Sequence, residues 1–462
     1  MKMEKVILVT GSGGLVGSEV CRFYLNKGFK VFGIDNDMRQ EFFGKDASTK
    51  STIDELLFND NYIHKNIDIR NYSEIEKLFK TYGEQIECVV HTAAQPSHDW
   101  ASKDPLTDYS VNSTGTINLL EAYRLNCPKA AFIFTSTNKV YGDTPNKIDF
   151  FEDEKRYTPN DVQKYSEGID EHMSIDQSLH SVFGASKVSA DIMVQEYGRY
   201  FNLNTAVFRG GCLTGPKHKG VELHGFLSYL VKCAIHNKSY TIYGYKGKQV
   251  RDNIHSEDLV KAFDCYYRNP SKPGVVYNIG GGKYSNCSII EAIDIIEEIS
   301  GKRLNYNISE TVRSGDHQWW ISDLTKFKSD YPEWSITKDI KSIIKDIVEY
   351  EIRSVEEKTI KDKILDYIIK EFGEKQTIGD RTKHYSYCSF PSEDCTCNDL
   401  RDIKYDTTLI TGGYIDSFSM VMVLDFLEKE FKIQIPNKIA TPENFNTVNN
   451  MYELVKFVKI NK

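Results

Sequence analysis

Short apolar stretches alternate with amphipathic ones through the first part of the chain. Residues 6–10 ("VILVT"), 30–35 ("KVFGID"), 87–94 ("ECVVHTAA") and 130–137 ("AAFIFTST") have the length and the β-branched or aromatic content of buried strands. Between them, "SEIEKLFKTYG" and "GTINLLEAYRLN" have helical periodicity. This alternation predicts an α/β fold, a doubly wound parallel sheet with helices on both faces.

Several small or polar residues fall where the predicted strands end. Ligands of such sheets bind at the carboxyl ends of the strands, so residues at these ends are expected to border one cleft. The residues concerned are Asp68, Ala93, Ala94 and Thr137.

Glycines follow the first predicted strand and open a helix-like segment, in "GSGGLVG". Gly11, Gly14 and Gly17 allow a sharp turn and a close approach of the backbone to a pyrophosphate, whose charge is then stabilised by the helix N-terminus. A second strand ends at Asp35, where a carboxylate can accept hydrogen bonds from adenosine ribose hydroxyls. The combination predicts a dinucleotide site that prefers NAD over NADP, although Arg39 nearby weakens this preference.

Charge and hydropathy exclude two classes of protein. The chain has 462 residues and a net charge of −8, and nucleic-acid-binding proteins usually have a basic face instead. No apolar run approaches the ~20 residues that span a bilayer, and "VILVT" is too short for a signal peptide. Most cysteines stand singly in apolar surroundings, which is typical of reduced thiols. We therefore expect a cytoplasmic protein without nucleic-acid or membrane partners.

These pieces together resemble the extended short-chain dehydrogenase/reductases, the NAD-dependent nucleotide-sugar epimerases and dehydratases. The matching motifs are "TGSGGLVG", "NIDIR", "HTAAQ", "TSTNKVYG", "GASK" and "KQVRDNIHSEDLV", within residues 1–345. The resemblance is strongest to the CDP-paratose 2-epimerase group, through "FTSTNKVYG" and "YNIGGG". It implies a Rossmann-type domain with a smaller α/β substrate lobe, mainly residues 212–330, whose amphipathic segments include a capping box formed by Ser288 and Glu291.

The resemblance also implies roles for individual residues. Thr137 matches the residue that hydrogen-bonds the sugar hydroxyl to be oxidised, and Arg251 and Arg313 match arginines that bind the nucleotide diphosphate. His224, Tyr243 and Asp316 would lie near the sugar nucleotide. Asp68 and Ile69 would contact adenine, and Lys187 would hold the nicotinamide ribose. The expected cofactor residues are Gly11, Gly14, Leu15, Val16, Asp35, Asn36, Arg39, Asp68, Ile69, Ala93, Gln95 and Lys187.

One catalytic element of the family is absent. A tyrosine normally lies four residues before the lysine, where the ammonium lowers the pKa of the phenol, but this position holds Phe183. Thr137, Lys187 and Phe183 thus form an incomplete catalytic set. Either another group supplies the base, or the enzyme is slow or altered. Residues in the preceding insertion that are able to act as the base are Tyr165, Glu171, His172, Asp176 and His180.

The residues after Thr137 discriminate between reactions. Dehydratases of the family have Asp-Glu there as acid and base for loss of water, whereas this chain has Asn138 and Lys139. The resemblance therefore favours transient oxidation of a sugar carbon and return of the hydride, as in an epimerase. Two alternatives remain open: an oxidoreductase acting on a carrier-tethered substrate, and a catalytically silent NAD-binding scaffold. Family members are usually dimers through the helices beside the active site, so a homodimer is expected.

The C-terminal part changes in character. We expect a linker at residues 346–356, followed at 357–462 by an all-α helical bundle that resembles an acyl carrier protein, with an insertion at 376–402. The resemblance includes Asp416-Ser417 before the amphipathic "MVMVLDFLEKEF" and implies 4'-phosphopantetheine on Ser417, attached by a phosphopantetheinyl transferase and serving acyl-transferring enzymes. Asp and Ser also cap helices commonly.

The insertion contains a cysteine cluster. Cys388, Cys395 and Cys397, with His384 nearby, could hold zinc in principle. The C-x-C spacing differs from the usual C-x2-C, so free thiols in a loop are favoured and no metal site is expected.

Overall fold

The computed structural model describes residues 5–222, 225–312, 315–373, 403–412, 414–416 and 418–460. The chain divides into two compact units, Met1–Glu351 and Ile352–Lys462. Within the described ranges, none of the helices combines the length and the apolar character needed to cross a membrane.

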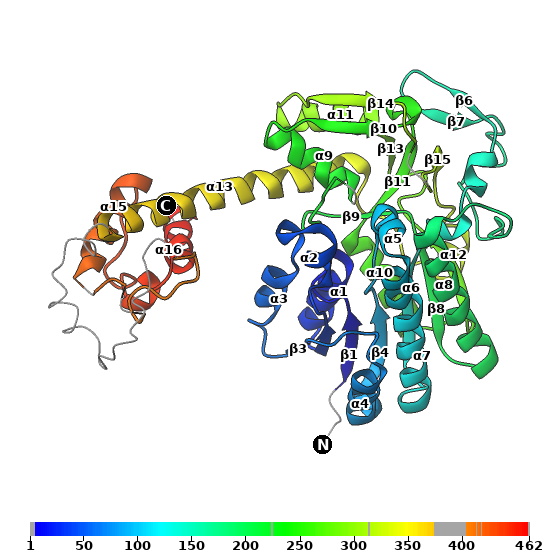
Figure 1. The fold of residues 1–462 in the computed structure, drawn as a ribbon, viewed down its shortest axis with the longest axis horizontal. Helices are drawn as coiled ribbons and strands as arrows, with labels where there is room; N and C mark the ends of the chain where they lie inside the picture. Colours follow the sequence, from blue (N-terminus) through cyan, green and yellow to red (C-terminus); the bar gives the residue numbers. More distant parts are fainter. Residues whose placement is uncertain are drawn as a thin grey trace. The chain divides into compact units, whose positions relative to one another are not determined.

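A parallel sheet forms the centre of the first unit (Figure 1). Among the described residues it has seven strands in the order β12-β8-β5-β4-β1-β2-β3. Strands β2 and β3 therefore extend the sheet on one side of β1, and the later strands extend it on the other side, beginning with β4. The predicted doubly wound parallel sheet is confirmed. The strands are β1 (Val6–Thr10), β2 (Lys30–Ile34), β3 (Tyr62–Lys65), β4 (Ile86–His91), β5 (Ala131–Thr137), β8 (Thr205–Gly210) and β12 (Val275–Ile279).

Both faces of this sheet are buried, which explains why its strands are apolar throughout instead of alternating. Val6 and Leu8 of β1 belong to the core on one face, and Ile7 and Val9 to the core on the other. The helices of the first face are α4 (Tyr72–Tyr82), α7 (Gly115–Asn126) and α8 (Ser181–Phe201), and those of the second are α1 (Leu15–Asn26), α3 (Lys50–Leu56), α10 (Ser256–Arg268) and α12 (Thr325–Asp330).

A buried ion pair fixes helix α8 on the sheet. Asp191 of α8 accepts two hydrogen bonds from Arg209 of β8, at 3.0 Å from Nε and 2.9 Å from Nη2. Ser136 of β5 donates a third, at 2.6 Å. Because Phe183 and Lys187 lie on the same helix, this ion pair also fixes their position relative to the carboxyl ends of the strands.

The smaller lobe is not a continuous segment. Residues 212–330, predicted to form it, also contain β12, α10 and α12 of the large domain, because these elements return to cover and extend the large sheet. The predicted capping box of Ser288 and Glu291 is confirmed at the start of α11. The elements of the lobe are β6 (Phe150–Glu152), β7 (Tyr157–Pro159), β9 (Cys212–Thr214), β10 (Tyr240–Tyr243), β11 (Val250–His255), β13 (Asn286–Ser288), β14 (Tyr306–Ser309), β15 (Trp319–Trp320), α9 (Phe226–Ile235) and α11 (Ile289–Ser300).

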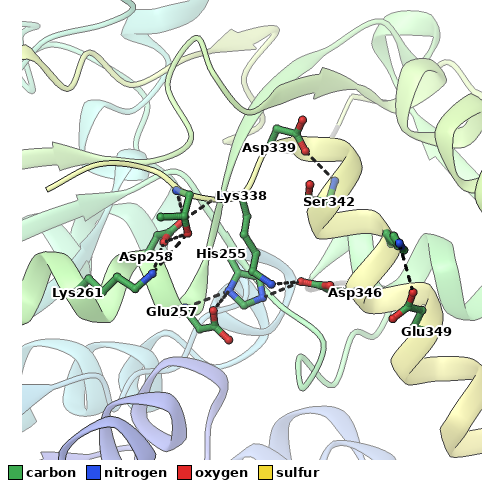
Figure 2. A network of polar contacts seen from close by, with 11 residues as sticks. His255, Glu257, Asp258, Lys261, Lys338, Asp339, Ser342, Asp346 and Glu349 are labelled. Atoms are coloured by element: carbon green, nitrogen blue, oxygen red, sulfur yellow. Dashed lines mark hydrogen bonds and ion pairs between the residues drawn. The ribbon is translucent and has the colours of Figure 1, made fainter.

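Helix α13 (Ile340–Gly373) includes residues 346–356, where we expected a linker. The sequence explains the difference, since no proline or glycine interrupts residues 340–372 and charged pairs such as Glu357–Lys361 support the helix. Polar contacts hold the start of α13 (Figure 2). Asp258 accepts hydrogen bonds from the Thr337 and Lys338 amides, and Lys338 pairs with Asp346.

The second unit has a helical core of its own. Ile364 and Ile368 of α13 pack with Val423 and Leu427 of α15 (Ser419–Phe431) and with Val455 of α16 (Val448–Ile460). The amphipathic segment "MVMVLDFLEKEF" predicts α15, and the predicted all-α character of this unit agrees with the described helices. The insertion at 376–402, with Cys388, Cys395, Cys397 and His384, lies outside the described residues, as does Ser417.

Replacing Asp191 with Asn should lower the free energy of unfolding by about 3–5 kcal/mol, because Arg209 would remain buried without its counter-charge. Glu196→Gln on the same helix is the matched control; Glu196 pairs with Arg199 at the surface, so its loss should change stability by less than about 1 kcal/mol. Urea unfolding of both variants measures this. Equal effects of the two substitutions would contradict the structural role of the buried pair.

Candidate functional site

The turn between β1 and α1 requires glycine at two positions. Gly11 has φ = +69°, a conformation that other residues rarely adopt. At Gly17, a Cβ atom would lie 2.1 Å from the Gly11 carbonyl oxygen, so α1 can approach the turn only without a side chain there. The close approach directs the N-terminus of α1 into a cavity of about 470 Å³ at the carboxyl ends of the strands.

Asp35 lies at the rim of this cavity, directly after β2. Its carboxylate accepts hydrogen bonds from the Gly13 amide at 2.9 Å, the Asp37 amide at 2.9 Å and the Thr49 hydroxyl at 3.0 Å. These bonds fix the carboxylate beside the glycine turn. Arg39, on α2 (Met38–Phe43), also borders the cavity; burial lowers the pKa of its guanidinium to about 10.

Most of the residues predicted for cofactor and substrate line this one cavity. Asp68 is paired with Arg70 at 2.6 Å; burial alone would raise the pKa of its carboxyl, but the Arg70 hydrogen bonds lower it overall. The predicted residues that line the cavity are Gly11, Gly14, Leu15, Val16, Asp35, Asn36, Arg39, Asp68, Ile69, Ala93, Thr137, Phe183, Lys187, Arg251 and Asp316.

Two predicted residues, Gln95 and Tyr243, do not line this cavity. Gln95 is fully buried and donates to Asp108 at 2.7 Å and to the Ser97 carbonyl at 2.8 Å, since a buried amide must find partners. It therefore belongs to a structural network and does not border the cavity. The Tyr243 hydroxyl donates to Glu222 at 3.3 Å, and Tyr243 does not line the cavity either. His224 and Arg313 lie outside the described residues.

Thr137, Lys187 and Phe183 all line the cavity. Thr137 ends β5, and its hydroxyl oxygen accepts a hydrogen bond from the Lys139 amide at 3.2 Å. The Lys187 ammonium donates to the Thr135 carbonyl at 3.0 Å, and burial lowers its pKa to about 8. The buried Phe183 ring lies one helical turn before Lys187.

The residues suggested to replace the missing base are elsewhere. Tyr165 packs against Trp319, with ring centroids 6.2 Å apart, and Glu171 accepts a hydrogen bond from the Asn278 amide at 2.6 Å. The side chain of His172 is 93% exposed. Asp176 is exposed, and His180 hydrogen-bonds the Val140 carbonyl at 2.9 Å. All are absent from the cavity lining, because the insertion packs against the smaller lobe and the sheet edge.

Sequence analysis did not identify Lys139 and His98, which line the cavity, as candidate functional residues. Lys139 lies 3.9 Å from Asp316, and burial lowers the pKa of its ammonium to about 8. His98 begins α5 (His98–Lys103), which is followed by α6 (Pro105–Tyr109), and its ring contacts Phe183 edge to face at a centroid distance of 4.9 Å. The signal for Lys139 was its place two residues after Thr137; that for His98 was its place shortly after the strand-end residues Ala93 and Ala94.

Arg251 and Asp316 form an ion pair at this end of the cavity. Burial would raise the pKa of the Asp316 carboxyl, but the charges of Arg251 and Lys139 lower it below its ordinary value. The cavity therefore joins a glycine turn with a ribose-binding type of carboxylate at one end to a hydroxyl, buried ammonium groups and a guanidinium at the other. This arrangement can hold a dinucleotide beside an anionic hydroxyl-bearing substrate.

Comparisons with known proteins agree with this geometry. The model of the NAD dependent epimerase/dehydratase family matches residues 7–280. CDP-paratose 2-epimerase of Salmonella typhi is 32% identical over 340 residues, which cover 71% of this chain and 94% of that protein. UDP-glucuronate 4-epimerase of Thermodesulfobacterium geofontis is 27% identical over 342 residues, covering 73% of this chain and 94% of that protein.

Solved structures share the fold. A tyrosine-to-phenylalanine mutant of UDP-glucuronic acid 4-epimerase from Bacillus cereus, in complex with UDP-4-deoxy-4-fluoro-glucuronic acid and NAD, has a TM-score of 0.60 and 25% identity, over 76% of this chain and 99% of that chain. Pal from Bacillus thuringiensis has a TM-score of 0.63 and 23% identity over the same shares, which shows the fold alone.

The low pKa of Lys139 has a measurable consequence. An unfolded lysine keeps its proton to about pH 10.5, whereas folded Lys139 releases it near pH 8. Between these values the unfolded state binds more protons, so the Lys139 contribution to folding stability should rise with pH. The free energy of unfolding of the wild type should therefore increase from pH 8 to pH 10 relative to that of Lys139→Met, measured by urea unfolding. A constant difference would show that the burial does not lower this pKa.

Proposed function

Because the chain belongs to the NAD-dependent epimerase/dehydratase family, we propose that it is an NAD-dependent nucleotide-sugar epimerase similar to CDP-paratose 2-epimerase, active in cell-surface polysaccharide or secondary-metabolite biosynthesis. The observation that carries the proposal is the single cavity that connects the glycine turn of Gly11 and Gly17 with Thr137 and Arg251. A hydroxyl bound at Thr137 would thereby lie beside the dinucleotide.

The residues present suit NAD. A Cβ atom at Gly11 would lie 2.8 Å from the Ala93 amide nitrogen, so only glycine lets the turn pack against the segment after β4, and Asp35 offers a fixed carboxylate for ribose hydroxyls. Gly11, Gly14, Asp35, Asp68 and Lys187 would hold the dinucleotide. When bound, NAD accepts a hydride from the sugar carbon and returns it.

The protein contributes binding, orientation and charge. The Thr137 hydroxyl would hydrogen-bond the sugar hydroxyl that loses its proton. Arg251 would bind the diphosphate, sharing its guanidinium with Asp316. Asn138 and Lys139 replace the acid pair needed for loss of water, which favours epimerisation over dehydration.

Incubation with CDP-paratose should invert the sugar at C2, because the carbonyl formed by oxidation can accept the hydride on its opposite face; one-dimensional proton NMR of the anomeric region follows this. Thr137→Val should lower kcat by about 100-fold, since it removes a hydrogen bond to the reacting oxygen. An unchanged CDP-paratose spectrum would exclude this substrate. Absence of NAD or NADH in the denatured protein, with no uptake of either, would exclude a redox role.

For the second unit we propose a carrier function, with 4'-phosphopantetheine on Ser417 serving acyl-transferring enzymes. The supporting observation is the apolar surface at the start of α15, where Phe418 is 86% and Val421 60% exposed. Beside the start of this helix, Asp416 accepts a hydrogen bond from the Ser419 amide at 2.7 Å. Exposed apolar side chains beside a modifiable serine suit contact with partner enzymes.

Intact mass spectrometry after incubation with coenzyme A and a phosphopantetheinyl transferase should show the addition of one phosphopantetheine to the full chain, because in the sequence Ser417 stands between the exposed residues Asp416 and Phe418. Ser417→Ala should remain unmodified, and Ser419→Ala should be modified as the wild type is. An unmodified wild-type protein would remove the carrier function and leave the epimerase proposal unaffected.

The homodimer also remains a proposal. Apolar side chains are exposed on the helices beside the active site, among them Leu106 and Tyr109 of α6 and Val182, Ile192 and Tyr200 of α8. An isologous contact between two copies would cover them.

A further inference from the structure

Two cations share one carboxylate at the substrate end of the cavity. Nη2 of Arg251 donates to Oδ1 of Asp316, and Nζ of Lys139 lies 3.9 Å from the same oxygen. All three residues line the cavity. Because both cations lie beside one oxygen atom, they are close enough together to contact a single bound anion.

The carboxylate of Asp316 is held in place by its neighbours. Besides the bond from Arg251, Oδ1 accepts a hydrogen bond from the His317 amide at 3.1 Å. The Asp316 carbonyl oxygen accepts one from the Asn146 side chain at 2.9 Å. The pKa of the Asp316 carboxyl is lowered despite its burial, so this group is an anion at neutral pH. Its charge is thus fixed in position and is used mainly by Arg251.

The Lys139 ammonium lacks a hydrogen-bond acceptor. In the part of the chain that the structure describes, Asp316 is its ion-pair partner, and a separation of 3.9 Å is too long for a hydrogen bond. The Lys139 side chain is only 17% exposed and lines the cavity, so its three N–H donors face the cavity rather than bulk solvent. Burial lowers the pKa of this ammonium to about 8, as expected for a cation with too little compensation.

The other ionisable groups that interact with Lys139 supply no further negative charge. Burial raises the pKa of the Cys212 thiol to about 11, so the thiol keeps its proton. Burial also lowers the pKa of His317 well below its ordinary value, so that imidazole is neutral. Lys139 and Arg251 therefore carry one positive charge more than Asp316 balances. Such a charge, held away from bulk water, favours the binding of an anion.

The donors present indicate the chemistry of that anion. Guanidinium and ammonium groups both bind phosphate oxygens, the first through paired N–H donors and the second as a point charge. A diphosphate offers oxygens on two phosphorus atoms, so one such ligand can contact Arg251 and Lys139 together. The proposed nucleotide-sugar substrate contains this group.

We propose that Lys139 is a second diphosphate-binding residue beside Arg251, its ammonium donating to a phosphate oxygen of the nucleotide sugar; this inference rests on the proposed function. The substrate then supplies the acceptor that the protein withholds, and Asp316 keeps the two cations together before the substrate binds. At a position where dehydratases of the family have a glutamate, this chain uses a cation for binding.

Isothermal titration calorimetry of the full-length protein with NAD, using CDP and UDP as probes, tests this role. Lys139→Met should weaken the binding of both nucleotides by about 10- to 100-fold, because one charge-assisted hydrogen bond is lost. Lys147→Met is the matched control, since it removes the same charge from an exposed side chain outside the cavity. Its nucleotide affinities should stay within about twofold of the wild type. NAD content should be equal in all three proteins.

The nucleotide affinity should also depend on pH. The wild-type affinity for CDP should fall by about tenfold between about pH 7.5 and pH 9.5, because Lys139 loses its proton near pH 8 and the anion binds the protonated form. Lys139→Arg keeps a permanent cation, so its affinity should remain nearly constant over this range. This second variant also retains the buried charge, which provides a test if Lys139→Met folds poorly.

Contrary results are distinguishable. Equal CDP and UDP affinities of the wild type and Lys139→Met overturn the inference, as does a wild type that binds neither nucleotide; inversion of CDP-paratose by the same wild type would leave the proposed function intact. If Lys139→Met weakens the binding of UDP-glucuronate alone, the cation serves a sugar carboxylate and the inference is overturned. A wild type with Lys139-dependent nucleotide affinity that leaves CDP-paratose unchanged overturns the proposed substrate and supports the diphosphate site.

Discussion

The close approach of helix α1 to the turn after β1 is the constraint on which the site depends. Gly17 lies against the Gly11 carbonyl with no space for a side chain, so the helix N-terminus reaches the carboxyl ends of the strands. The two apolar faces of the sheet support this geometry by holding α1 and α8 on opposite sides. The cavity arises where the strand order reverses, a general consequence of this topology.

Helix α8 sets the chemistry at the other end of the cavity. The Asp191–Arg209 pair holds it against β8. Lys187 lies one helical turn before Asp191, Phe183 lies one turn before Lys187, and both line the cavity together with Thr137. Position 183 carries no phenol, and the residues proposed to bind cofactor and substrate still line the cavity. His98, from the neighbouring helix α5, contacts the Phe183 ring.

Predictions that depended on local chain order agree with the structure. The glycine turn, the position of Asp35 after β2 and the strand-end positions of Asp68, Ala93 and Thr137 follow from strand, loop and helix order alone. Predictions that depended on the direction of a side chain agree less well with the structure. Gln95 shares the strand end with Ala93, but its amide turns into a buried network with Asp108. The boundary between the two compact units falls within the predicted linker at 346–356, but these residues are helical, since no glycine or proline interrupts α13 there.

The sequence by itself determined the sheet, the glycine turn and the absence of a tyrosine at position 183, because each follows from short-range sequence patterns or from residue identity. Only the tertiary structure decided which ionisable groups lie beside Phe183. Tyr165, Glu171, His172, Asp176 and His180 are close to Phe183 along the chain but point elsewhere, whereas His98 reaches the ring across 85 residues of chain. Proton transfer requires contact in space, and contacts between distant segments are set by packing of the whole domain.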